Sequence, residues 1–286
     1  MGMFGRFRRV GVLAGASLFL LASCFPQREE RTAAFATEGS IVVGNFERER
    51  AERDREFAVR LSAVMRNAEL PAELYMSLME VSTWNPAFVR DLHAVLAGPP
   101  YLRALVDPWH SLPAGYSPPD LVPLREGSYR VSRAGMMLRH SAAVSLEEMA
   151  RAARADGITL VASSAYRSYE HQTNVHNHWV QVMGRAAAER VSARPGHSQH
   201  QTGLALDFGD ITNAFAQTPA GLWMADNAIR FGWSLSYPDG YEHVTGYSWE
   251  SWHFRYLGRE LAAFKENYFG GKQQFVLRFL HEWERL

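Results

Sequence analysis

Two histidines and an aspartate stand out as candidate metal ligands, in the stretches GHSQHQTGLALDFGD (196–210) and WESWHFRY (249–256). His200 precedes a run of small and apolar residues that ends at Asp207, and His253 lies in the second stretch. Catalytic zinc usually takes three nitrogen or oxygen ligands from the protein and leaves a fourth position to water. These three side chains meet that count, so we interpret them as a zinc site rather than as a polar loop before a half-buried strand.

Two further side chains could act on a substrate at such a metal. Glu250 lies three residues before His253, near enough to reach a metal-bound water without being a ligand. Zinc lowers the pKa of its water to about 7, and a carboxylate can then remove the proton. Arg167, in SSAYRSYEHQ, lies at an expected strand-to-helix junction, where its guanidinium could stabilise an oxyanion. The pattern predicts metal-assisted hydrolysis at a carbonyl group.

These residues resemble the signature of a known family, the zinc D-alanyl-D-alanine carboxypeptidases of the VanY type. The superfamily also contains the VanX dipeptidases and the metal domain of Hedgehog. The signature S-x-H-x-x-G-x-A-x-D, followed later by E-x-W-H, is present as residues 198–207 and 250–253. The likeness extends from about Leu102 to about Gly258, a little over half of the chain.

The resemblance implies a role for each matching residue. It implies Zn²⁺ as the cofactor and a peptidoglycan stem peptide as the substrate, with Arg167 holding the scissile carbonyl oxygen or the substrate carboxylate. The implied site consists of the zinc ligands His200, Asp207 and His253, the catalytic residues Glu250 and Arg167, and the substrate-binding residues Ser198, Gln172 and Tyr166.

Two positions depart from the family pattern. Ser251 stands where the family often has proline, and Gln199 stands where it often has glutamate after the motif serine. Neither change removes a ligand or the base. We therefore expect them to bear on specificity more than on activity.

The elements that must position these side chains predict an α+β fold. Residues 158–162, 203–208 and 252–256 have strand patterns. Helices are expected from a capping box at Ser145 to Gly157, from Ser168 to about Gly184, and from Thr218 to Gly232. We expect helices packed on a central antiparallel sheet that carries the zinc site, preceded by a small helical region.

The expected organisation along the chain has five parts. A signal peptide (1–23) and a polar tether (24–45) precede a helical region (46–100), a VanY-like zinc peptidase domain (101–258) and a C-terminal helical tail (259–286). The proline-rich stretch 97–124 is expected to be extended. The tail is expected to form two short helices joined at Gly270 and Gly271.

The N-terminus has the pattern of an export signal. Arginines at positions 6, 8 and 9 precede an apolar run, 10–22, that is too short to span a bilayer. Leu21-Ala22-Ser23-Cys24 resembles the bacterial lipobox, so Cys24, the sole cysteine, is the expected lipidation site. We expect a cell-envelope protein, exported and lipid-anchored to a membrane, on the periplasmic side or on the outer face of the cytoplasmic membrane.

Composition excludes several alternatives. Lys+Arg and Asp+Glu both total 30, so no nucleic-acid partner is indicated. The S-x-x-K motif of serine peptidases needs a serine three residues before a lysine. The only lysines are Lys265 and Lys272, and the residues three before them are Ala262 and Phe269, so the motif is absent. Cysteine-dependent wall enzymes are excluded because Cys24 is assigned to the anchor.

The remaining histidines are weaker candidates. His176 and His178 are two apart on an expected helix, so they point about 200° apart and cannot chelate one ion. We expect both at the surface. His171 and His197 flank the proposed cleft and are lesser candidates for substrate contact.

The expected activity is release of the terminal D-alanine from peptidoglycan stem peptides by a metal-activated water, as a D,D-carboxypeptidase. L,D-carboxypeptidase action on tetrapeptide stems is the close alternative, and dipeptidase activity is a weaker one. A noncatalytic peptidoglycan-binding lipoprotein is the alternative from another class, although the chain keeps both the candidate base and the arginine.

Overall fold

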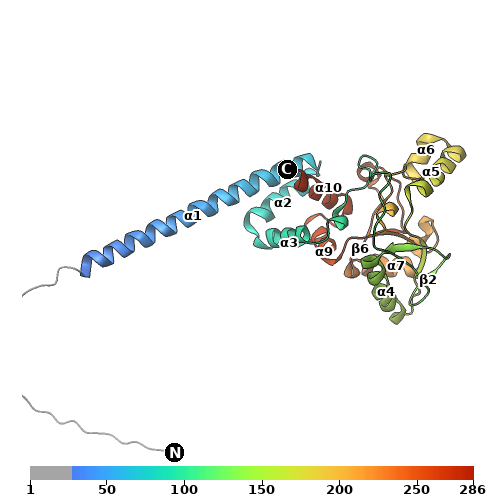
Figure 1. The fold of residues 1–286 in the computed structure, drawn as a ribbon, viewed down its shortest axis with the longest axis horizontal. Coiled ribbons are helices and arrows are strands. Elements are labelled where there is room, and N and C mark those ends of the chain that lie inside the picture. Colours follow the sequence, from blue (N-terminus) through green and yellow to red (C-terminus); the bar gives the residue numbers. More distant parts are fainter. Residues whose placement is uncertain (1–27) are drawn as a thin grey trace, which may run out of the picture. The chain divides into compact units, whose positions relative to one another are not determined.

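The structure, a computed structural model, describes the backbone of residues 28–286 and the side chains of residues 47–80 and 85–286 (Figure 1). The chain divides into two compact units, Met1–Arg53 and Asp54–Leu286. The expected signal peptide and Cys24 lie outside the described residues. Within the described part, no helix is both long enough and apolar enough to cross a membrane.

Helix α1 (Arg28–Asn67) begins earlier than the sequence predicts. Residues 28–45 were expected to belong to a polar tether, with helix starting at Phe46. The structure instead includes them in α1. The apolar spacing that marks a helix in this sequence starts only near Phe57, so periodicity could not show the earlier helical turns.

A five-stranded sheet with the order β2-β4-β5-β7-β6 supports the central part of the chain. Its strands are β2 (Arg130–Val131), β4 (Val161–Ser164), β5 (Ala205–Phe208), β6 (Trp233–Leu235) and β7 (His253–Tyr256). All neighbouring strands are antiparallel except β2 and β4, which are parallel. The expected α+β class is confirmed, with one parallel pair added at the edge.

A small second sheet joins β1 (Leu121–Pro123) to β3 (Met137–Arg139) in antiparallel register. Strand β1 lies within the proline-rich stretch for which the sequence predicts an extended chain. The strands β1, β2 and β3 have only two or three residues each. That length is too short to carry a two-residue period, so the sequence did not predict β2 or β3.

Helices around the five-stranded sheet begin and end mostly where local signals predict. Ser168 caps α5 (Tyr169–Met183), and Gly184 ends it. Thr218 caps α7 (Pro219–Asn227), and a short 3-10 turn then leads to Gly232, whose φ of +82° suits glycine. Two short helices, α6 (Arg185–Val191) and α8 (Glu242–Thr245), were not expected.

Two further predicted boundaries, those of α4 and β4, lie several residues away from the observed ones. Helix α4 (His140–Ala155) begins before Ser145, whose hydroxyl is buried and donates to the carbonyl of Phe231 at 2.6 Å instead of capping a helix. Strand β4 begins at Val161 rather than Ile158. In both places a tertiary hydrogen bond or strand pairing, which the local pattern does not contain, determines the boundary.

The apolar residues form two clusters. One packs α4 and α7 against the sheet, with Leu146, Met149, Leu206 and Phe208 almost fully buried. The other joins the end of α1 to α2 (Ala72–Trp84), α3 (Pro86–Ala97), α9 (Arg259–Tyr268) and α10 (Gln273–Arg285). In Figure 1 these last helices gather beside one another. The helical region and the C-terminal tail, which are far apart in the sequence, thus share one core.

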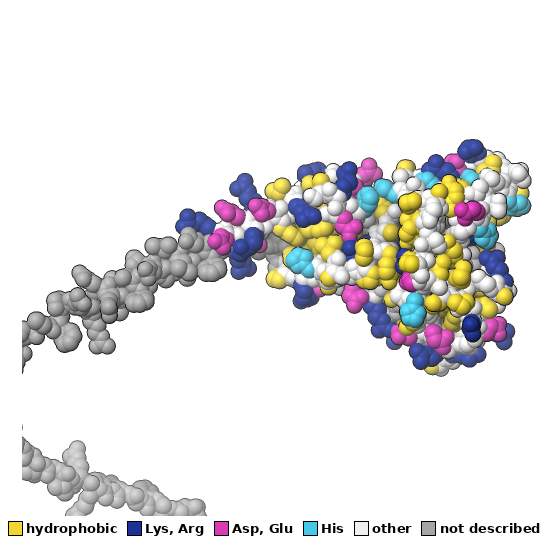
Figure 2. Space-filling model, in the orientation of Figure 1, with side chains coloured by type: hydrophobic (Ala, Val, Ile, Leu, Met, Phe, Trp, Pro, Cys, Tyr) yellow, Lys and Arg dark blue, Asp and Glu magenta, His cyan; other side chains and the backbone are white. Residues whose placement is uncertain are grey.

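Charged side chains of both signs are interspersed over the visible face of the unit Asp54–Leu286 (Figure 2). This distribution agrees with the zero formal charge of the chain.

Candidate zinc centre

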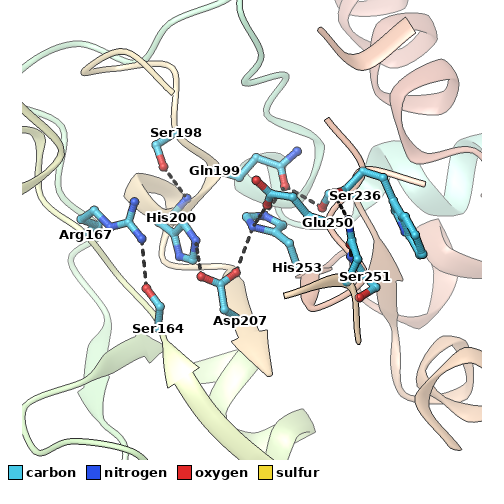
Figure 3. Close-up of polar contacts among 12 residues, drawn as sticks. Ser164, Arg167, Ser198, Gln199, His200, Asp207, Ser236, Glu250, Ser251 and His253 are labelled. Atoms are coloured by element: carbon cyan, nitrogen blue, oxygen red, sulfur yellow. Dashed lines mark hydrogen bonds and ion pairs between the residues drawn. The ribbon is translucent and has the colours of Figure 1, made fainter. Parts of the chain in front are cut away.

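The three candidate ligands meet at one point of the sheet (Figure 3). One ligand atom from each of His200, Asp207 and His253 lies within 4.8 Å of the others. His200 Nε2 is 3.2 Å from Asp207 Oδ2, and His253 Nδ1 is 3.0 Å from Asp207 Oδ1. All three side chains are buried. Asp207 on β5 is the direct partner of His253 on β7, so antiparallel pairing brings these two distant parts of the sequence together.

The signature around His200 folds as a single 3-10 turn, η2 (Gln199–Thr202). The Ser198 hydroxyl accepts from the His200 N–H at 3.3 Å, which caps the turn. Gly203 ends the turn with a φ of +71°, and its N–H donates to the His200 carbonyl. The serine, histidine and glycine of S-x-H-x-x-G therefore have one local purpose, which is to orient His200 just before β5.

The donor set fits zinc. The Nδ1 of His200 lies 2.8 Å from the carbonyl oxygen of Ala165, which leaves Nε2 to face Asp207. Asp207 Oδ1 is buried and makes no hydrogen bond of good geometry, although it lies close to His253. A buried carboxylate oxygen without such a bond is costly unless a cation occupies its vicinity. Two imidazoles and one carboxylate with room for a fourth ligand are a usual catalytic zinc set.

The ionisation of the ligands depends on burial and on each other. Burial lowers the pKa of His200 to about 4, with partial opposition from Asp207, so His200 is neutral at pH 7. Burial raises the pKa of Asp207, but the two imidazoles outweigh it and hold that pKa well below its usual range. Burial lowers the pKa of His253, but the hydrogen bonds to Asp207 and Glu250 outweigh it and raise the value to about 9.

Glu250 lies beside the ligands, with Oε2 3.3 Å from His253 Nδ1. Burial raises the pKa of Glu250, and the neighbouring His253 partly opposes this effect. The backbone N–H of Glu250 donates to the carbonyl of Tyr237, which fixes the segment before β7. A carboxylate with a raised pKa next to a metal site is suited to accepting and returning a proton.

Arg167 approaches the ligands from the end of β4. Its Nη1 donates to Gln172 Oε1 at 2.8 Å and its Nη2 donates to Ser164 Oγ at 3.0 Å. Its backbone N–H donates to the carbonyl of His200. Burial lowers the pKa of Arg167, but guanidinium stays charged in proteins. The positive group is therefore held in place by uncharged partners.

A cavity of about 410 Å³ opens over the metal ligands. Arg167, Glu250 and Ser198 line it together with the three ligands. Gln172 is fully buried behind Arg167 and donates to the carbonyl of Ala193, and it is not part of the lining. Tyr166 is also outside the lining, and its hydroxyl donates to Ser117. Contact of Gln172 and Tyr166 with a substrate stays a prediction.

Part of the cavity lining is apolar and was not predicted. Val175, Trp179 and Met183 come from α5, and Val191 comes from α6. The first three recur every four residues, the spacing that places side chains on one helix face. The sequence therefore contained a signal for this apolar surface, although the helix was predicted only from the residues at its ends, Ser168 and Gly184. Aromatic residues complete the lining: Tyr237, Tyr247, Trp249 and Trp252.

The other histidines lie away from the cavity lining. His178 and His171 are exposed. His176 was expected at the surface but is buried, with Nδ1 3.1 Å from the carbonyl oxygen of Ser192. That contact joins α5 to the segment after α6, a tertiary packing that local periodicity cannot indicate. His197 Nδ1 lies 2.8 Å from the carbonyl oxygen of Asp107.

Comparison with known proteins gives consistent matches. The sequence model of the VanY family, described as D-alanyl-D-alanine carboxypeptidase, matches residues 135–259. The putative carboxypeptidase YodJ of Bacillus subtilis (strain 168) is 38% identical over 174 residues, which are 58% of this chain and 64% of YodJ.

Solved structures extend the likeness to the fold. An LdcB LD-carboxypeptidase superposes with a TM-score of 0.57 at 32% identity, over 63% of this chain and 86% of that one. A second match is a mutant of the vancomycin-resistance D,D-pentapeptidase VanY in complex with Zn(II). It superposes with a TM-score of 0.50 at 30% identity, over 63% of this chain and 99% of that one. The chain spans 64%, 47% and 34% of the lengths of three curated relatives, so each relative is longer than the shared part.

Proposed function

The chain belongs to the VanY family of D-alanyl-D-alanine carboxypeptidases, and from this membership and the site geometry we propose that it is a zinc-dependent D,D-carboxypeptidase of peptidoglycan stem peptides. The observation that carries the proposal is the shared cavity, in which Glu250 and Arg167 face a buried cluster of His200, Asp207 and His253. The product would be free D-alanine and a peptide that is one residue shorter.

When bound by the three ligands, zinc supplies Lewis acidity that activates a water molecule and polarises the scissile carbonyl. Glu250 would accept the proton of that water at Oε2 and later donate it to the amine of the leaving D-alanine. Burial raises the pKa of Glu250, which favours both halves of this transfer near neutral pH.

Arg167 supports exopeptidase action. Among the residues that the structure describes, it is the only lysine or arginine that lines the cavity, and Gln172 and Ser164 hold its guanidinium in place. A guanidinium binds carboxylates with strong, directed hydrogen bonds. We therefore assign Arg167 to the terminal carboxylate of the substrate, which an internal peptide bond would not offer.

L,D-carboxypeptidase action on tetrapeptide stems is the second candidate. The similarity to a solved LdcB LD-carboxypeptidase favours it specifically. Both activities release a terminal D-alanine, and they differ in the configuration of the preceding residue. That residue would lie in the part of the cavity between the metal ligands and the apolar wall on α5 and α6.

The test is cleavage of defined penta- and tetrapeptides by the purified protein, followed by mass spectrometry of the products. Loss of one alanine from the pentapeptide supports D,D-carboxypeptidase action, and loss of one alanine from the tetrapeptide supports the second candidate. Loss of two alanines as a dipeptide would indicate a dipeptidase. Product that is undiminished after a chelator has removed the metal would contradict both proposals.

Glu250→Ala tests the proposed base and also the noncatalytic alternative. We expect turnover to fall by about 10²- to 10⁴-fold because general base catalysis contributes on that order, while bound zinc is retained. Glu260→Ala is the matched control, since Glu260 is an exposed carboxylate on α9. A peptidoglycan-binding protein without catalysis would show no turnover to lose, and its peptide affinity would persist in the variant.

Export and lipid anchoring through Cys24 are part of the proposal. They are supported by the N-terminal sequence pattern, and the anchor would hold the catalytic unit in the cell envelope, beside the wall. Cys24→Ser should move the protein from the membrane fraction to the soluble fraction. Detection of an unmodified Cys24 in the mature protein would contradict the anchor without affecting the proposed chemistry.

A further inference from the structure

A series of buried side-chain hydrogen bonds links helix α10 to the ligand His253. Gln273 Nε2 donates to Ser236 Oγ at 3.1 Å, and Ser236 Oγ donates to Gln199 Oε1 at 2.7 Å. The same Gln199 oxygen lies 3.3 Å from His253 Nε2. All four side chains are at most 4% exposed. Figure 3 shows the end of this series, where Gln199 lies between Ser236 and His253.

The chemistry of the groups fixes the direction of every hydrogen bond. The amide nitrogen of Gln273 can only donate, so Ser236 Oγ accepts from it and uses its own hydrogen toward Gln199. The Gln199 Oε1 atom can only accept, and therefore the partner nitrogen of His253 must carry a hydrogen. A neutral imidazole with its hydrogen on Nε2 has its lone pair on Nδ1. Nδ1 is the atom that faces Asp207.

His200 also has one ring nitrogen facing an oxygen acceptor and the other facing Asp207, but its acceptor is of a different kind. The Nδ1 of His200 faces the backbone carbonyl of Ala165, which leaves Nε2 toward Asp207. A backbone carbonyl cannot be lost by substitution, whereas the acceptor for His253 is a side chain supported by two others. The orientation of His253 therefore depends on residues far from it in the sequence.

We propose that Gln199, Ser236 and Gln273 are positioning residues that fix the tautomer and ring orientation of His253, so that it binds the metal through Nδ1. The proposal rests on the zinc site of the proposed function. It also makes α10 a supporting part of the metal centre, although α10 lies beyond the residues 135–259 that match the family model. Removal of a side chain that hydrogen-bonds to a metal ligand typically lowers metal affinity or activity by about 10- to 100-fold.

The test measures zinc affinity of the full chain by competition with a chromophoric chelator, in the absence of any peptide. Gln199→Leu removes the acceptor and should weaken zinc binding by about 10- to 100-fold. Gln199→Glu keeps an acceptor oxygen at the same place and should retain the affinity. The absorption spectrum of the Co²⁺ form should change in Gln199→Leu and be preserved in Gln199→Glu, because a displaced ring alters the ligand geometry.

Ser236→Ala and Gln273→Met test the more distant links. Each should weaken zinc binding by less than Gln199→Leu, and the double variant should be no weaker than Ser236→Ala alone, because both changes interrupt one series. Ser234→Ala is the matched control. Ser234 is also buried, lies on the adjoining strand β6, and its hydroxyl donates to the carbonyl of Leu235. The zinc affinity of the Ser234→Ala variant should equal that of the unchanged protein.

Zinc affinity of Gln199→Leu within twofold of the unchanged protein would overturn the proposal. Equal losses of zinc affinity in Gln199→Leu and Gln199→Glu would overturn it as well. If Gln199→Leu does not fold, the comparison of Gln199→Glu and Ser236→Ala with Ser234→Ala decides the question. The proposed function fails separately: a protein that shows this pattern of zinc affinities but cleaves no stem peptide would refute the peptidase assignment and leave the positioning role intact.

Discussion

Each candidate ligand ring has an oxygen partner on both of its nitrogens. His200 lies between Ala165 and Asp207, and His253 lies between Gln199 and Asp207. Rotation of either ring would break contacts on both sides. The ligand geometry is therefore organised by the protein itself, and this reduces the conformational cost of metal binding.

Zinc binding should release about one proton near pH 7.5. In the metal-free protein Asp207 and Glu250 raise the pKa of His253 to about 9, so His253 is cationic below that pH. The pKa of His200 is about 4, so that ring is already neutral. A ligand must be deprotonated, so apparent zinc affinity should rise about tenfold per pH unit between the pKa of His200, about 4, and that of His253, about 9, and level off above it.

Calorimetry in two buffers with different ionisation enthalpies measures the number of protons released. His178→Ala, which removes an exposed histidine, should give the same number. Binding without proton release would mean that His253 is neutral before the metal arrives.

Arg167→Met should raise KM more than it lowers kcat if the guanidinium binds the terminal carboxylate. Hydrogen bonds to charged groups contribute about 1.5–3 kcal/mol, which corresponds to roughly 10- to 100-fold in affinity. Steady-state kinetics with free and C-terminally amidated pentapeptides measures this effect. The unchanged protein should prefer the free acid, and the variant should lose that preference. A fall in kcat at constant KM would instead assign Arg167 to the developing oxyanion.

At the scale of elements, one glycine determines how the turn that carries His200 joins the sheet. Gly203 has a φ of +71°, and a Cβ at this position would lie 3.0 Å from Leu121 Cδ2 and 3.2 Å from Arg139 Cγ. The small sheet of β1 and β3 thus packs directly against the end of η2. A larger residue would strain the backbone and move that sheet or His200.

Gly203→Ala should lower the free energy of unfolding by about 1–3 kcal/mol, the cost of holding a non-glycine residue in the left-handed region. Zinc affinity should fall as well because the Gly203 N–H holds the carbonyl of His200. Gly115→Ala is the control, since a Cβ there would meet no atom within 4 Å. Denaturant unfolding of the metal-free proteins measures the free energy of unfolding. Equal values for Gly203→Ala and Gly115→Ala would contradict the proposed strain at Gly203.

The elements that the sequence predicted are those with local signals at their ends. Ser168, Thr218 and Gly232 mark helix boundaries through caps that act within one turn. The pairing of Asp207 with His253 was accessible because both stretches alternate with a two-residue period and carry the family signature. The cluster of His200, Asp207 and His253, with Glu250 beside it, was therefore predictable from the sequence.

What the sequence could not predict depends on contacts between distant segments. The bonds from Gln273 to Ser236 and from Ser145 to Phe231 join residues that no spacing rule relates. The short strands β2 and β3 form because neighbouring strands offer them partners. Likewise, Gln172 holds Arg167 from behind the cavity wall, and the motif alone cannot distinguish that position from contact with a substrate.

At the scale of the whole molecule, helices from both ends of the unit Asp54–Leu286 form one core. Phe57 packs against Trp283 with ring centroids 5.5 Å apart, and Arg60 donates to the carbonyl of Trp283. Leu61, Met65 and Leu92 are fully buried in this cluster. The tail that supplies Gln273 to the zinc centre is thus held in place by the helices that precede the family match.

A chain that begins at Asp54 should keep its melting temperature and zinc affinity, because it contains the whole second unit. A chain that begins at Pro99 should not fold stably. It loses Leu61, Met65 and Leu92, each contributing about 1.5–3 kcal/mol on burial, which together approach the 5–15 kcal/mol stability of a typical domain. Thermal unfolding followed by circular dichroism distinguishes the two. A cooperative transition at the same temperature in both chains would show that the helical region is dispensable.

The shared core of Leu61 and Trp283 has a consequence for the order of events during biosynthesis. Translation makes Leu61 long before Trp283, so this cluster cannot close until Trp283 has been synthesised. Until then α2 and α3 lack the surface that covers them, and the Gln273 support of the metal ligand does not yet exist. A nascent polypeptide of this design would acquire its full zinc affinity only after α10 has docked.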